Sequence, residues 1–236
     1  MIAISPSRLR EAVAAIYPEI EARAGTRVSV QDERKLWWEL SCALLSSQVP
    51  FELAVAAADA VDARSLLLDP DAAIGTLQAG LAAALRAPVQ CGSTMRRYRF
   101  PQLKARQLAA TRVAVSQAAG SLRALLAAIS EGPAARAWLV TNAPGLGPKQ
   151  ASMFLRNVGL SHDLAVLDRH VVAYMRMVGL YSESAGSVTV LGSYVLHELE
   201  LRSHARRLGC SVGLLDWAIW IVMRAARENQ REVTCR

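Results

Sequence analysis

Two side chains in the second half of the sequence, Lys149 and Asp168, are of types that together could cleave the bond between a sugar and a base. A neutral lysine amine can attack an electrophilic sugar carbon and form a Schiff base. A carboxylate can assist departure of the base and stabilise the positive charge that develops on the sugar. The separation of the two residues along the chain does not show whether they meet, so this chemistry depends on the elements that carry them.

Lys149 follows a glycine-dependent turn at 144–147, and Pro148 suits the first position of a helix, where its missing N–H costs nothing. A cation is electrostatically unfavourable in the first turn of a helix, but the same positive potential favours a neutral, reactive amine. The turn, with Gly145 and Gly147, allows N–H groups to approach a phosphate closely. Lys149 is therefore either a nucleophile or a phosphate contact in a helix-hairpin-helix, and spacing does not choose between the two.

Asp168 is expected to be the N-cap of a helix over residues 169–178, a position where aspartate is among the best residues. A catalytic role is compatible with capping, because a capping carboxylate is held rigidly at the end of its helix. For His170, a contact to a backbone phosphate is a better expectation than acid–base catalysis.

Other side chains have two open interpretations. Gln48 could cap the helix that precedes it or reach a partner. The basic and aromatic run 96–100, which includes Arg99, could follow a phosphate backbone or form a solvated loop. Trp217 and Trp220 share one side of the last predicted helix, where core packing competes with base stacking.

Composition favours a basic protein with a polyanionic partner. The chain has 236 residues and a net charge of +7, which suits nucleic acid but also an ordinary basic enzyme. No apolar run reaches the length of a membrane span, and the N-terminus lacks the layout of a signal peptide, so we expect a soluble, cytoplasmic protein. The four cysteines are isolated, so neither an iron–sulfur cluster nor a metal site built from side chains is predicted.

Helical periodicity recurs along the chain without sustained strand-like alternation, which predicts an all-α fold of roughly ten helices. Residues 87–101 read as irregular, residues 25–30 as a connector, and residues 228–236 as a polar, frayed tail. Ser7 is expected to cap the first helix, which Pro18 should interrupt. The expected helices cover residues 7–24, 32–45, 51–63, 70–77, 81–86, 102–117, 122–130, 133–141, 148–158, 169–178, 194–208 and 213–227.

The segment 144–151 (Pro-Gly-Leu-Gly-Pro-Lys-Gln-Ala), followed by 166–170 (Val-Leu-Asp-Arg-His), resembles the helix-hairpin-helix and Gly/Pro-Asp motif of the DNA glycosylase superfamily. A lysine at Lys149 resembles the members that are both glycosylase and lyase. The sequence around Lys149 is most similar to that of the archaeal-type 8-oxoguanine DNA glycosylases. Segments 38–48, 98–106 and 215–220 agree in order and spacing, so the resemblance covers most of residues 35–225.

The resemblance implies a helix-hairpin-helix glycosylase fold with two interleaved helical lobes and a cleft between them. One lobe would span about 35–160 and contain the hairpin at 134–158, and the other would combine 1–34 with 161–227. The implied activity is excision of an oxidised purine, 8-oxoguanine, from damaged double-stranded DNA, followed by cleavage at the resulting abasic site. The expected partner is DNA, and we expect a monomer.

The resemblance also assigns residues. Lys149 would be the Schiff-base nucleophile and Asp168 the catalytic carboxylate. Gly145 and Gly147 would hold a phosphate, with a monovalent or divalent cation at the hairpin backbone and no required cofactor. His170 and Arg99 would contact DNA, and Gln48 would fill the space left by an extruded nucleotide. A base pocket would draw on Asp216, Trp217 and Trp220.

Two departures leave the recognised base open. In archaeal-type enzymes a terminal lysine soon after the last helix helps to recognise the base, whereas this chain continues to Arg236. Gln48 also replaces an asparagine often found at that position. The same chemistry on another lesion, and a non-catalytic DNA-binding module in which Lys149 contacts phosphate, remain alternatives.

Overall fold

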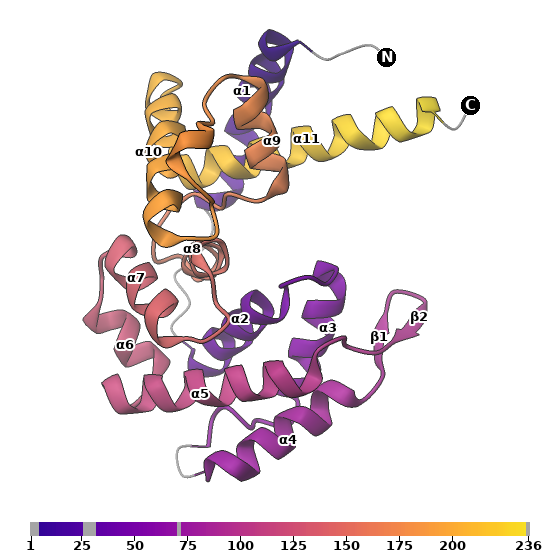
Figure 1. Cartoon of the computed structure of the whole chain (residues 1–236), viewed down its shortest axis with the longest axis vertical. Helices are drawn as coiled ribbons and strands as arrows, with labels where there is room; N and C mark the ends of the chain where they lie inside the picture. The colour runs from indigo at the N-terminus through magenta and orange to yellow at the C-terminus, as the bar shows by residue number, and fades with distance from the viewer. Residues whose placement is uncertain (1–4, 26–31, 70–71, 235–236) are drawn as a thin grey trace. The chain divides into compact units, whose positions relative to one another are not determined.

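The computed structural model describes residues 5–25, 32–69 and 72–234 (Figure 1). Contacts within the chain divide it into two compact units. The terminal unit consists of Met1–Val28 and Ser161–Arg236, and the central unit consists of Ser29–Leu160.

The terminal unit is a set of helices around one apolar core. In chain order its helices are α1 (Pro6–Gly25), α9 (Arg169–Met177), a short 3-10 helix η1 (Glu183–Ala185), α10 (Leu191–Arg207) and α11 (Val212–Thr234). Helix α11 packs against both α1 and α9. The core that they share includes Val13, Ile20, Tyr174, Leu201 and Ile219, all of them buried. Because α1 and α11 come from opposite ends of the chain, the unit forms only when distant segments meet.

The central unit holds the remaining helices and the one small sheet among the described residues. Helix α2 packs on α3 and α8, and α4 packs on α5. Buried leucines from several helices fill its interior, among them Leu36, Leu40, Leu81 and Leu108. Its elements are α2 (Glu33–Leu45), α3 (Phe51–Asp62), α4 (Ile74–Arg86), β1 (Val89–Cys91), β2 (Thr94–Arg96), α5 (Pro101–Ala119), α6 (Leu122–Ala128), α7 (Gly132–Asn142) and α8 (Pro148–Asn157).

The all-α prediction is confirmed, but the irregular segment predicted at 87–101 contains a β-hairpin. Strands β1 and β2 pair antiparallel, with Val89 opposite Arg96 and Cys91 opposite Thr94. Gly92, at φ 60°, makes the tight reversal between them, a conformation that glycine adopts without a steric penalty. Each strand has three residues, which is too short for alternation to be visible in the sequence.

The two short helices predicted at 70–77 and 81–86 are one helix, α4, and that prediction is wrong. The expected break fell near Gly80, but Gly80 lies inside the helix against Leu66. A Cβ at this position would come within 3.2 Å of the Leu66 Cδ2 atom. The glycine therefore serves close packing here and does not end a helix. Residues 70 and 71 lie outside the described part of the chain.

Three expectations at the chain ends are also corrected. Helix α1 runs through Pro18, which lies on the solvent side of the helix, where water can replace the lost backbone bond. Ser7 is not its cap, because the helix begins at Pro6 and the Ser7 hydroxyl donates to Glu11. The tail expected to be frayed continues helix α11 to Thr234. The connector predicted at 25–30 lies almost entirely outside the described residues.

In the described part of the chain, no single helix is long and apolar enough to cross a membrane; α10 and α11 meet the criteria only together, as a pair bent by 91°. Cys42, Cys91 and Cys210 are free thiols. Burial raises the pKa of the Cys42 thiol above its usual range, so this cysteine behaves as a small apolar side chain.

Candidate functional site

The glycine turn connects α7 to α8 and forms a helix-hairpin-helix. Gly145 has φ 82°, in the left-handed region that favours glycine. A Cβ at this position would lie 2.3 Å from the side-chain amide of Gln107 on α5. Close packing against Gln107 therefore also requires glycine here. Leu146 points into the core and anchors the turn, while Pro144 and Gly145 are exposed. The turn therefore presents backbone to the outside.

Lys149 lies in the first turn of α8, as predicted. Gly147 is the N-cap in an extended conformation, Pro148 follows it, and no acidic residue occupies this turn. The first backbone N–H groups of a helix have no partner within the helix, and they concentrate positive potential where the turn is exposed. The Lys149 side chain is half-buried beside these groups. This arrangement can hold an anion at the backbone and place an amine next to it.

Asp168 is the N-cap of α9, and the capping prediction is confirmed. One carboxylate oxygen, Oδ1, accepts hydrogen bonds from the backbone N–H groups of His170 at 2.8 Å and Val171 at 2.9 Å. The second oxygen, Oδ2, receives no hydrogen bond from the described residues. The carboxylate is therefore fixed through one oxygen, while the other remains available to a ligand.

The segment leading into Asp168 is held by three buried side chains of α10 and α11, which sequence reasoning did not identify as positioning residues. Tyr194 Oη donates to the Ala165 carbonyl at 2.6 Å and accepts from the Leu167 N–H at 2.9 Å. Glu198 accepts from the Ala165 N–H at 2.7 Å, and Asp216 accepts from the Val166 N–H at 2.5 Å. Three consecutive residues before the carboxylate are thus fixed by tertiary hydrogen bonds.

Replacing Tyr194 with phenylalanine should destabilise the protein by about 2–4 kcal/mol, because one buried N–H and one buried carbonyl would each lose their partner. Thermal or denaturant unfolding would measure the change. Tyr181→Phe is a matched control, since the Tyr181 hydroxyl makes no hydrogen bond within the described residues while its ring stacks on His197. A Tyr194→Phe variant as stable as the control would show that these bonds do not hold the segment.

His170 is buried, with 5% of its surface exposed. Its ring meets the edge of Trp220 with 6.4 Å between centroids, and its Nε2 accepts from Arg169 Nε at 3.2 Å. Its Nδ1 has no partner among the described residues. Burial lowers the pKa of His170, and Asp168 opposes that shift while Arg227, Arg169 and Arg224 add to it. A neutral imidazole follows at neutral pH, and its predicted contact to a phosphate stays a prediction.

Gln48 is exposed in the turn after α2, with a positive φ of 62° that is uncommon for a residue other than glycine. Two buried donors hold the end of α2 that leads into this turn. Tyr98 Oη donates to the Leu45 carbonyl at 2.7 Å, and Lys104 Nζ donates to the Leu44 carbonyl at 2.9 Å. Burial lowers the pKa of Lys104. The aromatic and basic run is therefore partly a structural support for Gln48.

The predicted residues fall into two groups, one in each unit. Gly145, Gly147, Lys149, Gln48 and Arg99 belong to the central unit, where Arg99 is exposed and its guanidinium lies 5.0 Å from the centre of the Phe100 ring. The terminal unit brings together Asp168, His170 and Trp220 through α9 and α11.

Of the other two residues predicted for a base pocket, Asp216 is buried and Trp217 is half-buried. Trp217 packs against the core of the terminal unit, and Asp216 has 2% of its surface exposed. Their proposed contacts to a base stay predictions.

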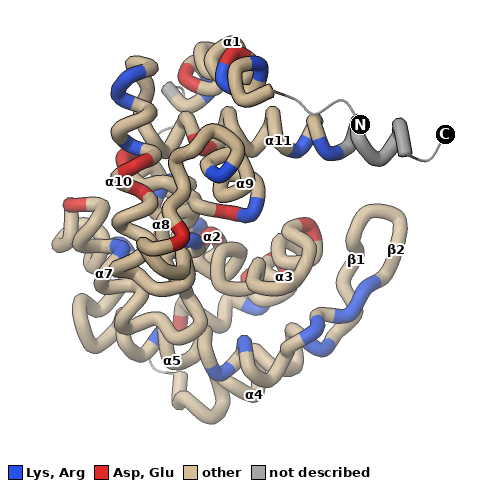
Figure 2. The backbone as a smooth tube through the Cα atoms, turned by 45° about the horizontal axis from the view of Figure 1, so that its top comes forward, with Lys and Arg blue, Asp and Glu red and all other residues tan. Residues whose placement is uncertain are grey.

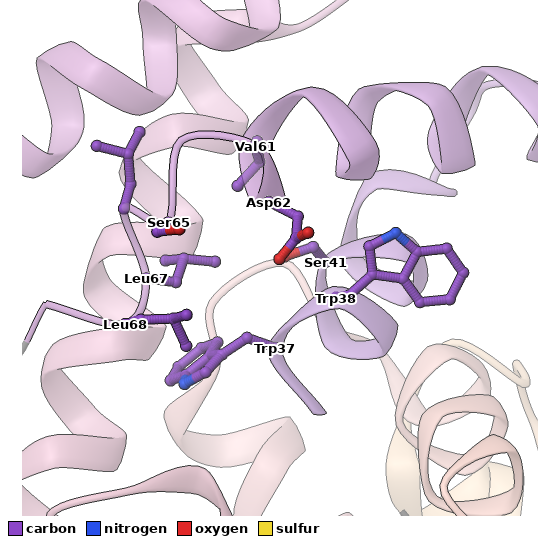
Figure 3. A pocket seen from close by; sticks show the side chains of 9 residues that line it. Trp37, Trp38, Ser41, Val61, Asp62, Ser65, Leu67 and Leu68 are labelled. Carbon is purple, nitrogen blue, oxygen red and sulfur yellow. The ribbon is translucent and has the colours of Figure 1, made fainter. Parts of the chain in front are cut away.

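A shallow pocket in the central unit lies apart from these residues (Figure 3). Trp37, Trp38, Ser41 and Asp62 line it together with residues 65–68, and none of the predicted site residues does so. Asp62 is paired with Arg34 at 2.8 Å, so this carboxylate is already satisfied. Among the described residues, no group of three or more His, Cys, Asp or Glu side chains is arranged to hold a metal ion.

Two curated relatives of this chain carry the same name. The 8-oxoguanine DNA glycosylase/AP lyase of Saccharolobus islandicus is 39% identical over 126 residues, which is 52% of this chain and 58% of that protein. The protein of the same name from Sulfurisphaera tokodaii is 38% identical over 125 residues, 52% of this chain and 57% of that protein. The chain thus matches little more than half the length of these relatives.

A solved structure is similar over a longer stretch. The 8-oxoguanine DNA glycosylase of Thermotoga maritima has a TM-score of 0.64 and 27% identity, covering 91% of this chain and 93% of that one. The family described as 8-oxoguanine DNA glycosylase matches residues 23–210. The match spans the hairpin, Lys149 and Asp168, and the chain therefore belongs to the 8-oxoguanine DNA glycosylase family.

Proposed function

We propose that this protein is a bifunctional DNA glycosylase and AP lyase that removes 8-oxoguanine from double-stranded DNA. The observation that carries the proposal is the place of Lys149: an amine in the first turn of α8, directly behind the exposed glycine turn of a helix-hairpin-helix. A backbone phosphate bound at that turn would bring the adjoining sugar toward the amine. Because its substrate is DNA, we expect the protein to act inside the cell.

In the first step, the neutral amine of Lys149 attacks C1′ of the damaged nucleotide. The bond between C1′ and the base breaks, and the base leaves with the electron pair and takes up a proton. The attacking nitrogen loses a proton, and its lone pair then forms the C=N bond as the C1′–O4′ bond breaks and O4′ takes up a proton, which gives a protonated imine between Lys149 and C1′. In the second step, a proton leaves C2′ and the bond from C3′ to its phosphate oxygen breaks. Strand cleavage by β-elimination follows, and water releases the lysine.

Asp168 supplies the negative charge that this reaction needs. Positive charge develops on the sugar as the base departs, and a carboxylate fixed in advance stabilises that charge without reorganising. Its N-cap bonds restrict the carboxylate through Oδ1, and the tertiary bonds of Tyr194, Glu198 and Asp216 restrict the backbone before it. These contacts support a rigidly placed catalytic group.

The DNA-holding part of the proposal uses backbone and turn residues. Gly145 and Gly147 hold a phosphate, and a cation at the backbone of this turn stays a prediction. Enzymes that act on a base inside a duplex first rotate the nucleotide out of the stack. Gln48, exposed and fixed in a left-handed turn, suits the role of filling the vacated space.

A panel of duplexes tests the proposal. Each duplex carries one lesion, either 8-oxoguanine, another oxidised purine or an oxidised pyrimidine, and cleavage is scored with and without alkali. We expect 8-oxoguanine duplex to be cleaved without alkali and to yield free base. If only a different damaged base is released, the proposed substrate is wrong and the proposed reaction stands. DNA binding without base release or cleavage of any duplex would show a non-catalytic binding module and overturn the proposal.

A further inference from the structure

The positive charge of this protein is concentrated in one stretch of the sequence. Residues 72–130 contain eight Lys and Arg residues and no Asp or Glu, whereas the rest of the chain has 19 basic and 20 acidic residues. The whole net charge of +7 therefore comes from this segment of the central unit. Figure 2 shows blue segments along β2 and into α5 without red ones between them.

Four exposed arginines of this stretch lie close together along the chain. Arg96 ends β2, Arg97 and Arg99 lie between β2 and α5, and Arg106 lies on the exposed side of α5. Gln102, Leu103 and Arg106 share one face of α5 because they recur at helical spacing, and all three are exposed. We call the surface formed by residues 94–106 the basic arm. Within the described residues, none of its arginines forms an ion pair.

Two other basic side chains of the same stretch are buried and donate hydrogen bonds within the unit, and Arg86 and Arg123 are exposed outside the arm. Lys104 is 5% exposed and donates to Leu44, and Arg112 donates to the Asp69 carbonyl. The arm arginines thus differ from Lys104 and Arg112: they are exposed and make no hydrogen bond or ion pair among the described residues, although Arg99 lies over the Phe100 ring. Met95 adds an apolar side chain that is 61% exposed beside them. A surface of this kind favours a ligand with regularly spaced negative charges and accessible sugar carbons.

Helix α5 connects the basic arm to the helix-hairpin-helix turn. The helix begins at Pro101, just after Arg99, and its Gln107 side chain lies against Gly145. At a rise of about 1.5 Å per residue, the part of α5 between Pro101 and Gln107 is about 9 Å long. Base pairs of DNA are separated by about 3.4 Å along the axis, so this length corresponds to roughly three base pairs. Both surfaces belong to the same unit.

We propose that the basic arm is a second DNA-binding surface, which holds phosphates of the duplex several base pairs from the nucleotide at the glycine turn. Arg96 and Arg97 contact the backbone, and Met95 packs against a sugar. The contact is independent of sequence, because a phosphate backbone carries no base information. Its function is to bind undamaged DNA and to fix the direction in which the duplex lies on the central unit. The inference depends on DNA as the ligand, as the proposed function requires.

Salt dependence of binding tests the basic arm. Each phosphate contact contributes about 0.9 to the slope of log K against log salt concentration. For an undamaged duplex, Arg96→Gln/Arg97→Gln should reduce that slope by about 1.8 and weaken binding. Arg96→Lys/Arg97→Lys should keep most of the slope, because the charges remain. The matched control is Arg64→Gln/Arg123→Gln, which removes two exposed arginines of the same unit outside the arm.

The control variant should keep the wild-type slope. An unchanged slope in the Arg96/Arg97 glutamine variant, or an equal loss in the control, would overturn the arm as a specific surface. Duplexes shortened from one end locate the arm on the DNA. The loss of affinity in the Arg96→Gln/Arg97→Gln variant should disappear once the phosphates on one side of the glycine turn are removed. A loss of affinity that does not depend on duplex length would also overturn the proposal. Undamaged DNA keeps this result separate from catalysis, which the lesion panel measures.

Discussion

Lys149→Gln is expected to abolish the covalent complex that borohydride traps between the enzyme and an 8-oxoguanine duplex. Glutamine has no amine to form the imine, so reduction has nothing to capture. Single-turnover cleavage of the strand should fall by about a thousandfold or more, which is the usual effect of removing a nucleophile. Trapping gels and single-turnover kinetics on the same duplex measure both effects. Binding of undamaged duplex should change little, because the backbone N–H groups of the turn remain.

Lys35→Gln is the matched control for this change. Lys35 also lies in the first turn of a helix, α2, and is exposed. We expect this variant to form the adduct at the wild-type yield. The chain has one further lysine, Lys104, whose ammonium donates to Leu44. A Lys149→Gln variant that still forms the adduct at full yield would assign the imine to another amine and remove the central residue of the mechanism.

Asp168→Asn should slow base release by about a hundredfold to ten-thousandfold while the protein stays folded. Asparagine caps helices about as well as aspartate, so its side-chain oxygen can keep the bonds to the His170 and Val171 N–H groups. The substitution removes only the negative charge. Single-turnover release of 8-oxoguanine measures the chemical step, and thermal unfolding measures the cap.

Asp168→Ala separates the two roles further. It removes the charge and the cap together, so it should lose about 1 kcal/mol of stability in addition to the slower reaction. Strand cleavage at an abasic site made beforehand should be affected less than base release in both variants, because the base has already departed. Base release by Asp168→Asn at the wild-type rate would reduce Asp168 to a structural cap.

Local interactions made much of the candidate site predictable. The start of α8 depends on Gly147, Pro148 and the turn before them, and the start of α9 depends on the bonds from Asp168 to residues two and three positions later. Such interactions join neighbours along the chain, so residue types at fixed spacing reveal them. The helices predicted around them agree with the structure for the same reason.

Two errors in the sequence prediction have identifiable physical causes. A break was predicted between residues 77 and 81, but Gly80 packs against Leu66 inside α4. The run 87–101 looked irregular because its strands are short, and its pairing joins residues across a turn. The Gly80 contact joins residues 14 positions apart, and the paired strands are too short to show alternation.

The sequence by itself determined the glycine turn, the amine in the first turn of α8 and the carboxylate at the cap of α9. Only the tertiary structure revealed what holds them. Tyr194 and Asp216 fix the backbone before Asp168 from 27 and 50 residues away, and Tyr98 supports the Gln48 turn from 53 residues away. A buried hydrogen bond forms wherever folding removes two polar groups from water together. That pairing depends on which segments meet in the core, and no short-range sequence pattern predicts it.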